Sequence, residues 1–208
     1  MSRIRADDYE EKKNGILSVA AALFADQGYS GCKMQDIAKA CNVSKSMLYH
    51  YFEKKEDVLY EILSQHLLRI VTLFEEYQPD LGTNETDINQ YFRTCIALYL
   101  ERSKASRARH VVALHDRRYL TSEQKSKIVK LERDILDRVS TVLQKVDSSY
   151  EQSEYRAHSL LLIGMMNWVE LWYRSSGKIS PDDFYDKVTN LFLHGFVKER
   201  RGVGVNAR

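Results

Sequence analysis

Hydrophobic positions recur at helical spacing along nearly the whole chain. From residue 9 to 27, and again from 55 to 77, apolar side chains fall three or four positions apart, which places them on one face of a helix. Similar segments follow up to residue 196, and only 9 Gly and 2 Pro interrupt the 208 residues. The pattern predicts an all-α protein of about nine helices, with little support for strands.

The stretch 37–52 predicts two short helices joined by a tight turn. Asn42 tolerates the left-handed backbone that ends a helix, and Ser44 is placed to cap the next one, beginning at Lys45. The apolar positions of the stretch can pack on a third helix and leave a polar ridge facing outward. That ridge contains no acid: Lys45, Ser46, Met47, Tyr49 and His50. Such a surface suits approach to phosphates.

The chain divides into a head and a body. The first three helices predict a helix-turn-helix domain over residues 1–54, and the remainder, 55–208, predicts a helical body. The first helix is expected over Tyr9 to Gln27. Residues 1–8 are expected to be a loose tail, in which Arg3 and Arg5 are weaker candidates for a DNA-contacting arm. A loop is expected over residues 79–86.

Positive charge is concentrated in one segment of the chain rather than spread over all of it. The formal net charge is only +2, from 31 basic and 29 acidic residues, so the protein is not a polycation that coats nucleic acid. Residues 28–52, however, contain Lys33, Lys39 and Lys45 against the single acid Asp36.

Several classes of protein are disfavoured. Three cysteines without metal-like spacing fit a reducing cytoplasm, and neither a signal peptide nor a segment long enough to span a membrane is evident. No nucleophile with its base, glycine-rich phosphate loop or pair of histidines at metal-binding spacing occurs. We therefore expect a soluble cytoplasmic protein that is not an enzyme and needs no metal or cofactor.

Five motifs in order resemble the TetR (tetracycline repressor-like) family of regulators over roughly the first 60 residues: Gly28-Tyr29, Asp36-Ile37-Ala38, Val43-Ser44-Lys45, Leu48-Tyr49-His50-Tyr51-Phe52 and Lys55-Glu56-Asp57-Val58-Leu59. One position departs from the family pattern. Lys33 stands where the family usually has a small hydroxyl residue, which leaves open how the second helix is capped.

The resemblance implies a homodimer that reads double-stranded operator DNA, with recognition helices about 34 to 36 Å apart. The expected DNA-binding residues are Lys33, Lys45, Ser46, Met47, Tyr49, His50 and Lys55. Among them, Lys45 and His50 are candidates for hydrogen bonds to bases or phosphates, and Met47 for contact with a thymine methyl group. Tyr49 and Lys55 are expected on the DNA backbone.

The resemblance also implies a body that dimerises through its last two long helices and encloses a small-molecule effector. Segment 160–173 is apolar nearly all round and would need cover on every side. Candidates for lining an effector pocket are the aromatic and methionine residues Phe92, Tyr99, Met165, Met166, Trp168 and Trp172. Ordinary core packing is the alternative for each of them.

Arg107 and Arg109 lie in a basic run that also contains Arg102, Lys104, Arg117 and Arg118. The chain's ending, NWVELWYRSSGKISPDDFYDKVTNLFLHGF, resembles that of TetR-like regulators of lipid, steroid or aromatic-acid breakdown, some of which sense acyl-coenzyme A thioesters. Arginines beside an apolar pocket would suit the phosphates of such a ligand, whereas an uncharged apolar compound would not need them. The expected function is a ligand-relieved repressor. Alternatives are an activator, an enzyme assembled from scattered residues, and a helical interaction module that binds no DNA.

Overall fold

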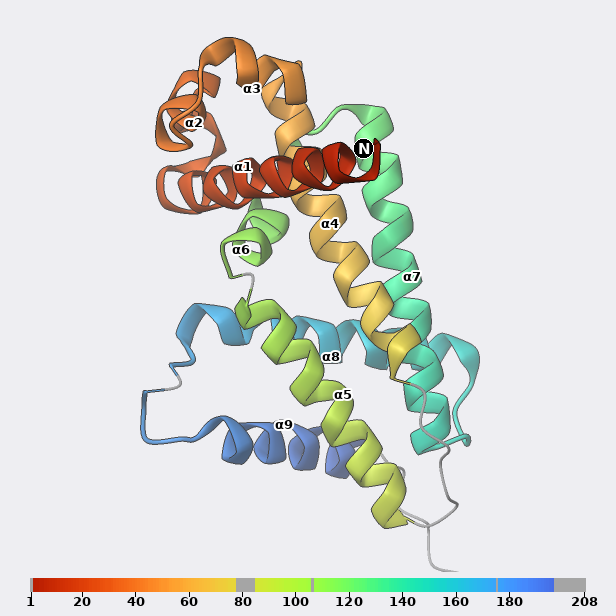
Figure 1. Ribbon diagram of the computed structural model, residues 1–208. Helices are drawn as coiled ribbons and strands as arrows, with labels where there is room; N and C mark the ends of the chain where they lie inside the picture. The colour runs from red at the N-terminus through yellow and green to blue at the C-terminus, as the bar shows by residue number, and fades with distance from the viewer. Residues whose placement is uncertain (1, 78–84, 106, 175, 197–208) are drawn as a thin grey trace, which may run out of the picture. The chain divides into compact units, whose positions relative to one another are not determined.

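The computed structural model describes residues 2–77, 85–105, 107–174 and 176–196 (Figure 1). Within these ranges the chain forms helices and no strand, which confirms the all-α prediction. The elements are α1 (Ser2–Gly31), α2 (Met34–Ala40), α3 (Lys45–Tyr51), α4 (Lys55–Glu76), α5 (Glu85–Ala105), α6 (Arg107–His115), a 3-10 turn (Arg117–Tyr119), α7 (Ser122–Val146), α8 (Gln152–Trp172) and α9 (Pro181–Phe196).

The helices form two compact units, each of which combines separate parts of the chain. The first comprises Met1–Glu76 with Glu101–Ile135, and the second comprises Tyr77–Leu100 with Leu136–Arg208. Helices α5 and α7 therefore contribute to both. The predicted boundary between a head of residues 1–54 and a body of 55–208 stays a prediction.

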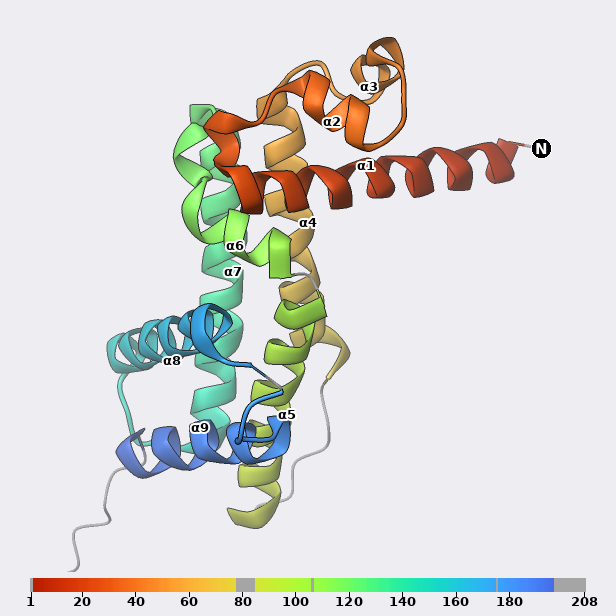
Figure 2. The same cartoon turned by 90° about the vertical axis from the view of Figure 1, so that its left-hand side faces the viewer.

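In the first unit, α1 lies between the helix-turn-helix and α6. Figures 1 and 2 show α2 and α3 on one side of α1 and α6 on the opposite side, with α4 running past both. One core joins these helices, and its fully buried members include Leu17, Phe24, Ile37, Leu48 and Leu59. Helix α1 therefore shares one buried core with the helix-turn-helix on one side and with α6 on the other.

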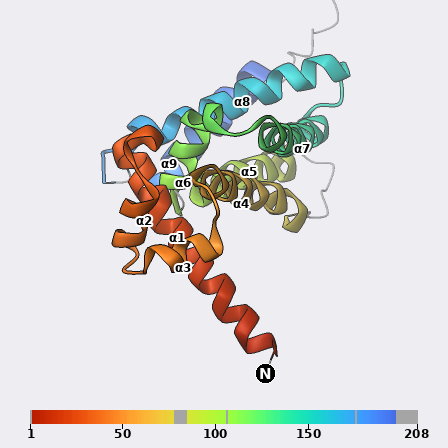
Figure 3. The same cartoon turned by 90° about the horizontal axis from the view of Figure 1, so that it is seen from above.

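Helix α1 is longer than the sequence predicted, because it starts at Ser2 rather than near Tyr9. Acids and bases four positions apart support an exposed helix, as the Lys12 ammonium and Asp8 carboxylate do at 2.9 Å. Figure 3 shows the first turns of α1 extending beyond the other helices of this unit. The side chains of Arg3 and Arg5 lie outside the described ones. Of the loop expected over residues 79–86, residues 79–84 also lie outside the described ranges, whereas 85 and 86 form the start of α5, so the loop was predicted to end too late.

Helix ends follow the capping residues in several places. Gly28 has a φ of 73°, a value that favours glycine, and interrupts the end of α1. Before α7, the Thr121 hydroxyl accepts from the Gln124 amide at 3.2 Å, and the Gln124 side chain accepts from the Thr121 amide at 3.1 Å. This reciprocal pair is a capping box. Ser180 caps α9 by accepting from the amide of Asp183 at 3.1 Å.

The second unit encloses an apolar core with two polar pairs inside it. The rings of Phe92 and Phe192 lie 5.6 Å apart, centroid to centroid. The Tyr99 hydroxyl donates to Oδ1 of Asn167 at 2.6 Å, and the hydroxyls of Ser140 and Ser159 are 2.9 Å apart. Such pairs satisfy polar groups that would otherwise be costly to bury.

Candidate DNA-binding surface and effector site

The turn before α3 has the conformation that its sequence predicted. Asn42 has a φ of 53°, in the left-handed region, and the Ser44 hydroxyl accepts a hydrogen bond from the Met47 amide at 3.1 Å. Helix α3 then starts at Lys45. The cap fixes where α3 begins and therefore which of its residues face outward.

Helix α3 presents an exposed ridge without an acid. Its five members are Lys45, Ser46, Met47, Tyr49 and His50, and all are exposed, with Met47 at 44% and Tyr49 at 42%. In contrast, Leu48 is fully buried and anchors the helix in the core. The predicted division between an inner and an outer face of α3 is therefore present in the structure.

Aromatic rings support this ridge from α1. The ring of Tyr9 lies 4.7 Å from that of Tyr51 and 6.2 Å from that of His50, with the His50 ring edge-on. On the outer face, the Lys45 ammonium lies 5.8 Å from the centroid of the Tyr49 ring. Tyr51 is half-buried.

Helix α2 is capped without the hydroxyl residue that the TetR-like pattern would place there. The backbone amide of Lys33 donates to the carboxylate of Asp36 at 2.8 Å. Asp36, the third residue of α2, therefore provides the acceptor for the backbone N–H group just before the helix. The Lys33 side chain is exposed and makes no capping hydrogen bond. Its contact with DNA stays a prediction.

Lys55 has a role that the sequence did not reveal. Its ammonium donates to the carbonyl oxygens of Tyr29 and Cys32, both at 2.7 Å, and lies 4.0 Å from the centroid of the Tyr29 ring. The side chain thus ties the start of α4 to the end of α1 and to the first residue after it. A phosphate contact by Lys55 stays a prediction.

Two family models match the chain. Residues 16–62 match the bacterial regulatory proteins of the tetR family, and residues 85–196 match the tetracyclin repressor-like C-terminal domain. A TetR-family transcriptional regulator from Bordetella parapertussis is 33% identical with a TM-score of 0.77, over 88% of this chain and 95% of that one. The chain belongs to the TetR family. It is accordingly a DNA-binding transcriptional regulator and not an enzyme.

Two further relatives are informative about the family. The HTH-type transcriptional repressor KstR2 of Rhodococcus jostii is 24% identical over 197 residues, which cover 91% of this chain and 95% of that protein. The structure of AibR in complex with isovaleryl coenzyme A and operator DNA has a TM-score of 0.69 at 23% identity, covering 86% of this chain and 97% of that one. At this identity the second likeness shows the shared fold.

The predicted effector residues of this TetR-family chain fall into three groups. Phe92, Tyr99 and Met166 are buried in the second unit, and Met165 is half-buried. Trp168 and Trp172 are 64% and 52% exposed, so they lie on the protein surface rather than in that core. Arg107 and Arg109 belong to the first unit. Effector binding by any of these residues stays a prediction.

The basic run from the end of α5 to the 3-10 turn does not form one surface. Arg102 pairs with Glu76 at 2.7 Å, Arg117 pairs with Glu132 at 2.5 Å, and Arg118 lies against the ring of Tyr119. The side chain of Lys104 lies outside those described. Arg107 and Arg109 instead line a pocket together with Arg69 of α4. Arg69 was missed because it stands alone among the apolar residues of its helix.

A buried histidine pair joins α4 to α6. Nε2 of His66 lies 3.0 Å from Nδ1 of His110, and both residues are 2% exposed. Burial, reinforced by the charges of His110, Arg109 and Arg69, lowers the pKa of His66 to about 3. The imidazole is therefore neutral at neutral pH.

The described residues contain neither a candidate metal site nor a candidate membrane span. Their histidines, cysteines and acids form no group of three or more that could hold a metal ion. No helix in the described ranges combines the length and hydropathy needed to cross a membrane.

Proposed function

We propose that the chain is a homodimeric repressor whose binding to operator DNA is relieved by an apolar or acyl-coenzyme A-like effector. The exposed, acid-free ridge of α3 carries the DNA-binding half of this proposal. Lys45 and His50 would donate to bases or phosphates, Met47 would contact a thymine methyl group, and Tyr49 the backbone. Lys33, Ser46 and Lys55 complete the proposed surface.

Repression and an acyl effector are supported by the relatives. The KstR2 proteins are repressors, and AibR was crystallised with isovaleryl coenzyme A together with operator DNA. The C-terminal family model covers the whole of α5 to α9. We infer that the effector binds within the second unit, among Phe92, Tyr99 and Met166.

The second unit has features that suit an apolar effector with a polar end. Methionine and aromatic side chains can repack around a ligand, and the hydrogen bond from Tyr99 to Asn167 offers a donor and an acceptor inside the core. Asn167 was not recognised in the sequence, because a single Asn in an apolar helix gives no sign of its partner.

Dimerisation is proposed through α8 and α9. Helix α8 leaves large apolar side chains exposed in the protomer, and α9 adds another: Leu160, Leu161, Trp168, Trp172 and Leu191. Exposed apolar side chains at this density mark a surface that a partner covers. A second copy of the chain is the proposed partner, since a dimer places two α3 helices on successive turns of DNA.

Relief of repression requires that the effector bind one state of the dimer better than the other. In the proposed switch, the effector favours a separation of the two α3 helices that no longer fits the operator. Helix α4, which begins directly after the helix-turn-helix, would transmit the change.

Calorimetry with a panel of acyl-coenzyme A esters and the matching free acids tests the effector. Tighter binding of the esters, together with release of operator DNA, is expected for an acyl-coenzyme A sensor. Tighter binding of the free acids would contradict a role for the phosphates. Tyr99→Phe should weaken binding of the ligand in either case, with Tyr91→Phe as the control on the same helix.

A further inference from the structure

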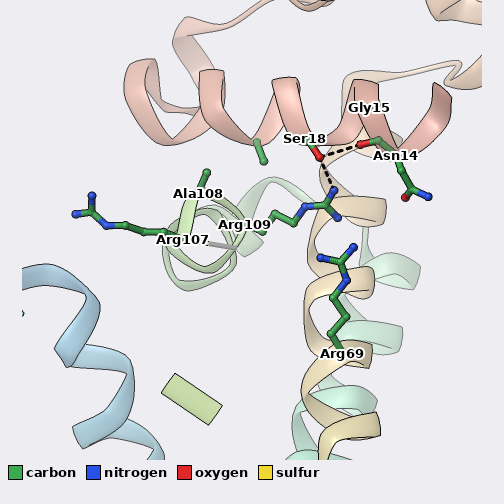
Figure 4. Close-up of a pocket in the computed structure, with 8 residues that line it drawn as sticks. Asn14, Gly15, Ser18, Arg69, Arg107, Ala108 and Arg109 are labelled. Carbon is green, nitrogen blue, oxygen red and sulfur yellow. Dashed lines mark hydrogen bonds between the residues drawn. The ribbon is translucent and has the colours of Figure 1, made fainter. Parts of the chain in front are cut away.

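Two arginine side chains face each other in a pocket of the first unit. The pocket has a volume of about 380 Å³ and lies where α1, α4 and α6 meet. Figure 4 shows Arg109 of α6 reaching toward Ser18 of α1, with the guanidinium of Arg69 pointing up toward it from α4. None of the eight lining residues is acidic, and three of them are arginines: Arg69, Arg107 and Arg109.

Arg109 is a buried cation held by neutral groups. It is only 6% exposed, and its guanidinium donates to Oε1 of Gln65 at 2.7 Å and to the hydroxyl of Ser18 at 2.9 Å. Burial, and then the positive charge of Arg69, lowers the pKa of Arg109. A charge buried in this way is stabilised by an opposite charge, which the lining residues do not supply.

The start of α6 adds to this positive environment. Arg107, Ala108 and Arg109 are the first three residues of a nine-residue helix, and helix starts leave backbone N–H groups without partners within the helix. Arg107 lines the same pocket, although Figure 4 shows its side chain extending to the other side of α6. The backbone N–H groups at the start of α6 and the charge of Arg107 both favour an anion close to α6.

We propose that this pocket binds the phosphate or diphosphate group of a small metabolite, held between the guanidiniums of Arg69 and Arg109. Arginine matches phosphate oxygens with paired N–H donors, and an anion with several oxygens can accept from two helices at once. The volume is within the range of small-molecule sites and leaves space for more than one phosphate.

The occupant is not the operator. Figures 1 and 2 place α6 on the side of α1 opposite α2 and α3, so the pocket and the proposed DNA surface lie on different sides of α1. An anion seated there would hold α6 against α1 and α4. Any effect of the bound anion on operator affinity rests on the proposed function. The binding of the anion itself does not.

Titration calorimetry of the full-length protein with inorganic pyrophosphate, at constant ionic strength, tests the site. Saturable binding is expected for the wild type, weakened at least tenfold by Arg69→Gln, whose exposed side chain lies outside the core. Arg133→Gln is the matched control, because it removes an exposed arginine of α7 in the same unit but outside the pocket. The control should stay within twofold of the wild type.

A second arm with adenosine diphosphate identifies the source of the diphosphate. Tighter binding than pyrophosphate supports a nucleotide-bearing metabolite, and equal binding supports the free anion. Absence of saturable binding of both probes, or equal affinities for the wild type and Arg69→Gln, would overturn the proposal. Neither probe contains an acyl chain, so failure of the acyl-effector proposal leaves this result unaffected.

Discussion

The ammonium of Lys55 is bound to Tyr29 twice over, since it donates to the Tyr29 carbonyl oxygen at 2.7 Å and lies 4.0 Å from the centroid of the Tyr29 ring. Tyr29 is itself 5% exposed and stacks on Tyr119 with centroids 4.6 Å apart. The first residue of α4 therefore anchors the segment that leads from α1 into the helix-turn-helix.

Replacement of Lys55 by Met keeps the aliphatic chain but removes the ammonium. We expect the free energy of unfolding to fall by about 3 kcal/mol, because two hydrogen bonds are lost and those made by charged groups contribute roughly 1.5 kcal/mol or more each. Urea unfolding measures the loss. Lys54→Met is the control, since the exposed neighbouring side chain makes no such bond. Equal urea midpoints for the two variants would show that the carbonyl contacts add no stability.

Tyr49→Ala should separate DNA binding from folding. The side chain is 42% exposed, so the thermal midpoint should change little, whereas affinity should fall by a similar factor on operator and unrelated duplexes. In contrast, Lys45→Ala and Met47→Ala should change sequence preference, by about 1 to 3 kcal/mol at each base pair read. Fluorescence anisotropy with operator duplexes and single-base variants measures both. If a folded Tyr49→Ala protein kept full affinity, Tyr49 would not contact the DNA backbone.

Substitutions of Ser44 can separate the effect of the α3 cap on stability from the effect of charge on DNA binding. Ser44→Ala should cost about 1 kcal/mol of stability, because the Met47 amide loses its acceptor. Ser44→Asp retains an acceptor and the stability but places a negative charge at the end of the proposed DNA surface, so only DNA affinity should fall. Ser44→Thr should retain both properties. If Ser44→Asp bound DNA as tightly as the wild type, this end of α3 would not approach phosphates.

Local features were predictable from the sequence and remote pairings were not. Asn42 and Ser44 fixed the start of α3 because turn and cap preferences act within three or four residues. The partners of Lys55, Arg109 and Tyr99 are 23 to 91 residues away in the sequence, and no local pattern indicates them. The start of α1 was placed too late because charged pairs along an exposed helix leave no apolar stripe.

The neutral state of His66 makes stability depend on pH. Its pKa is about 3 in the folded protein and near 6.5 when unfolded, so only the unfolded chain gains a proton as pH falls through 6.5. Lowering the pH from 6.5 to 5 is therefore expected to reduce the free energy of unfolding by about 2 kcal/mol through His66. Urea unfolding across this range should show a smaller loss for His66→Gln than for the wild type. The exposed control His194→Gln should follow the wild type.

The exposed apolar side chains of α8 predict how the protein assembles. Light scattering at micromolar concentration should give a dimer, and Leu161→Asp should give a folded monomer, because that residue is 67% exposed in the protomer. Loss of the dimer should also weaken operator binding, since each half-site would be bound alone. A wild-type monomer at this concentration would contradict the proposed interface.

Salt dependence of duplex binding is the most direct test of whether the acid-free ridge of α3 reads DNA. The affinity of the full-length protein for duplex DNA from the region upstream of its own coding sequence would be measured from 50 to 300 mM salt. We expect tight binding at low salt and a linear fall of log affinity with log salt, at a slope of roughly −0.9 for each phosphate contact. Lys45→Glu should abolish most of this binding. Absence of duplex binding by the folded wild type at low salt would contradict DNA recognition by α3 and favour a helical interaction module.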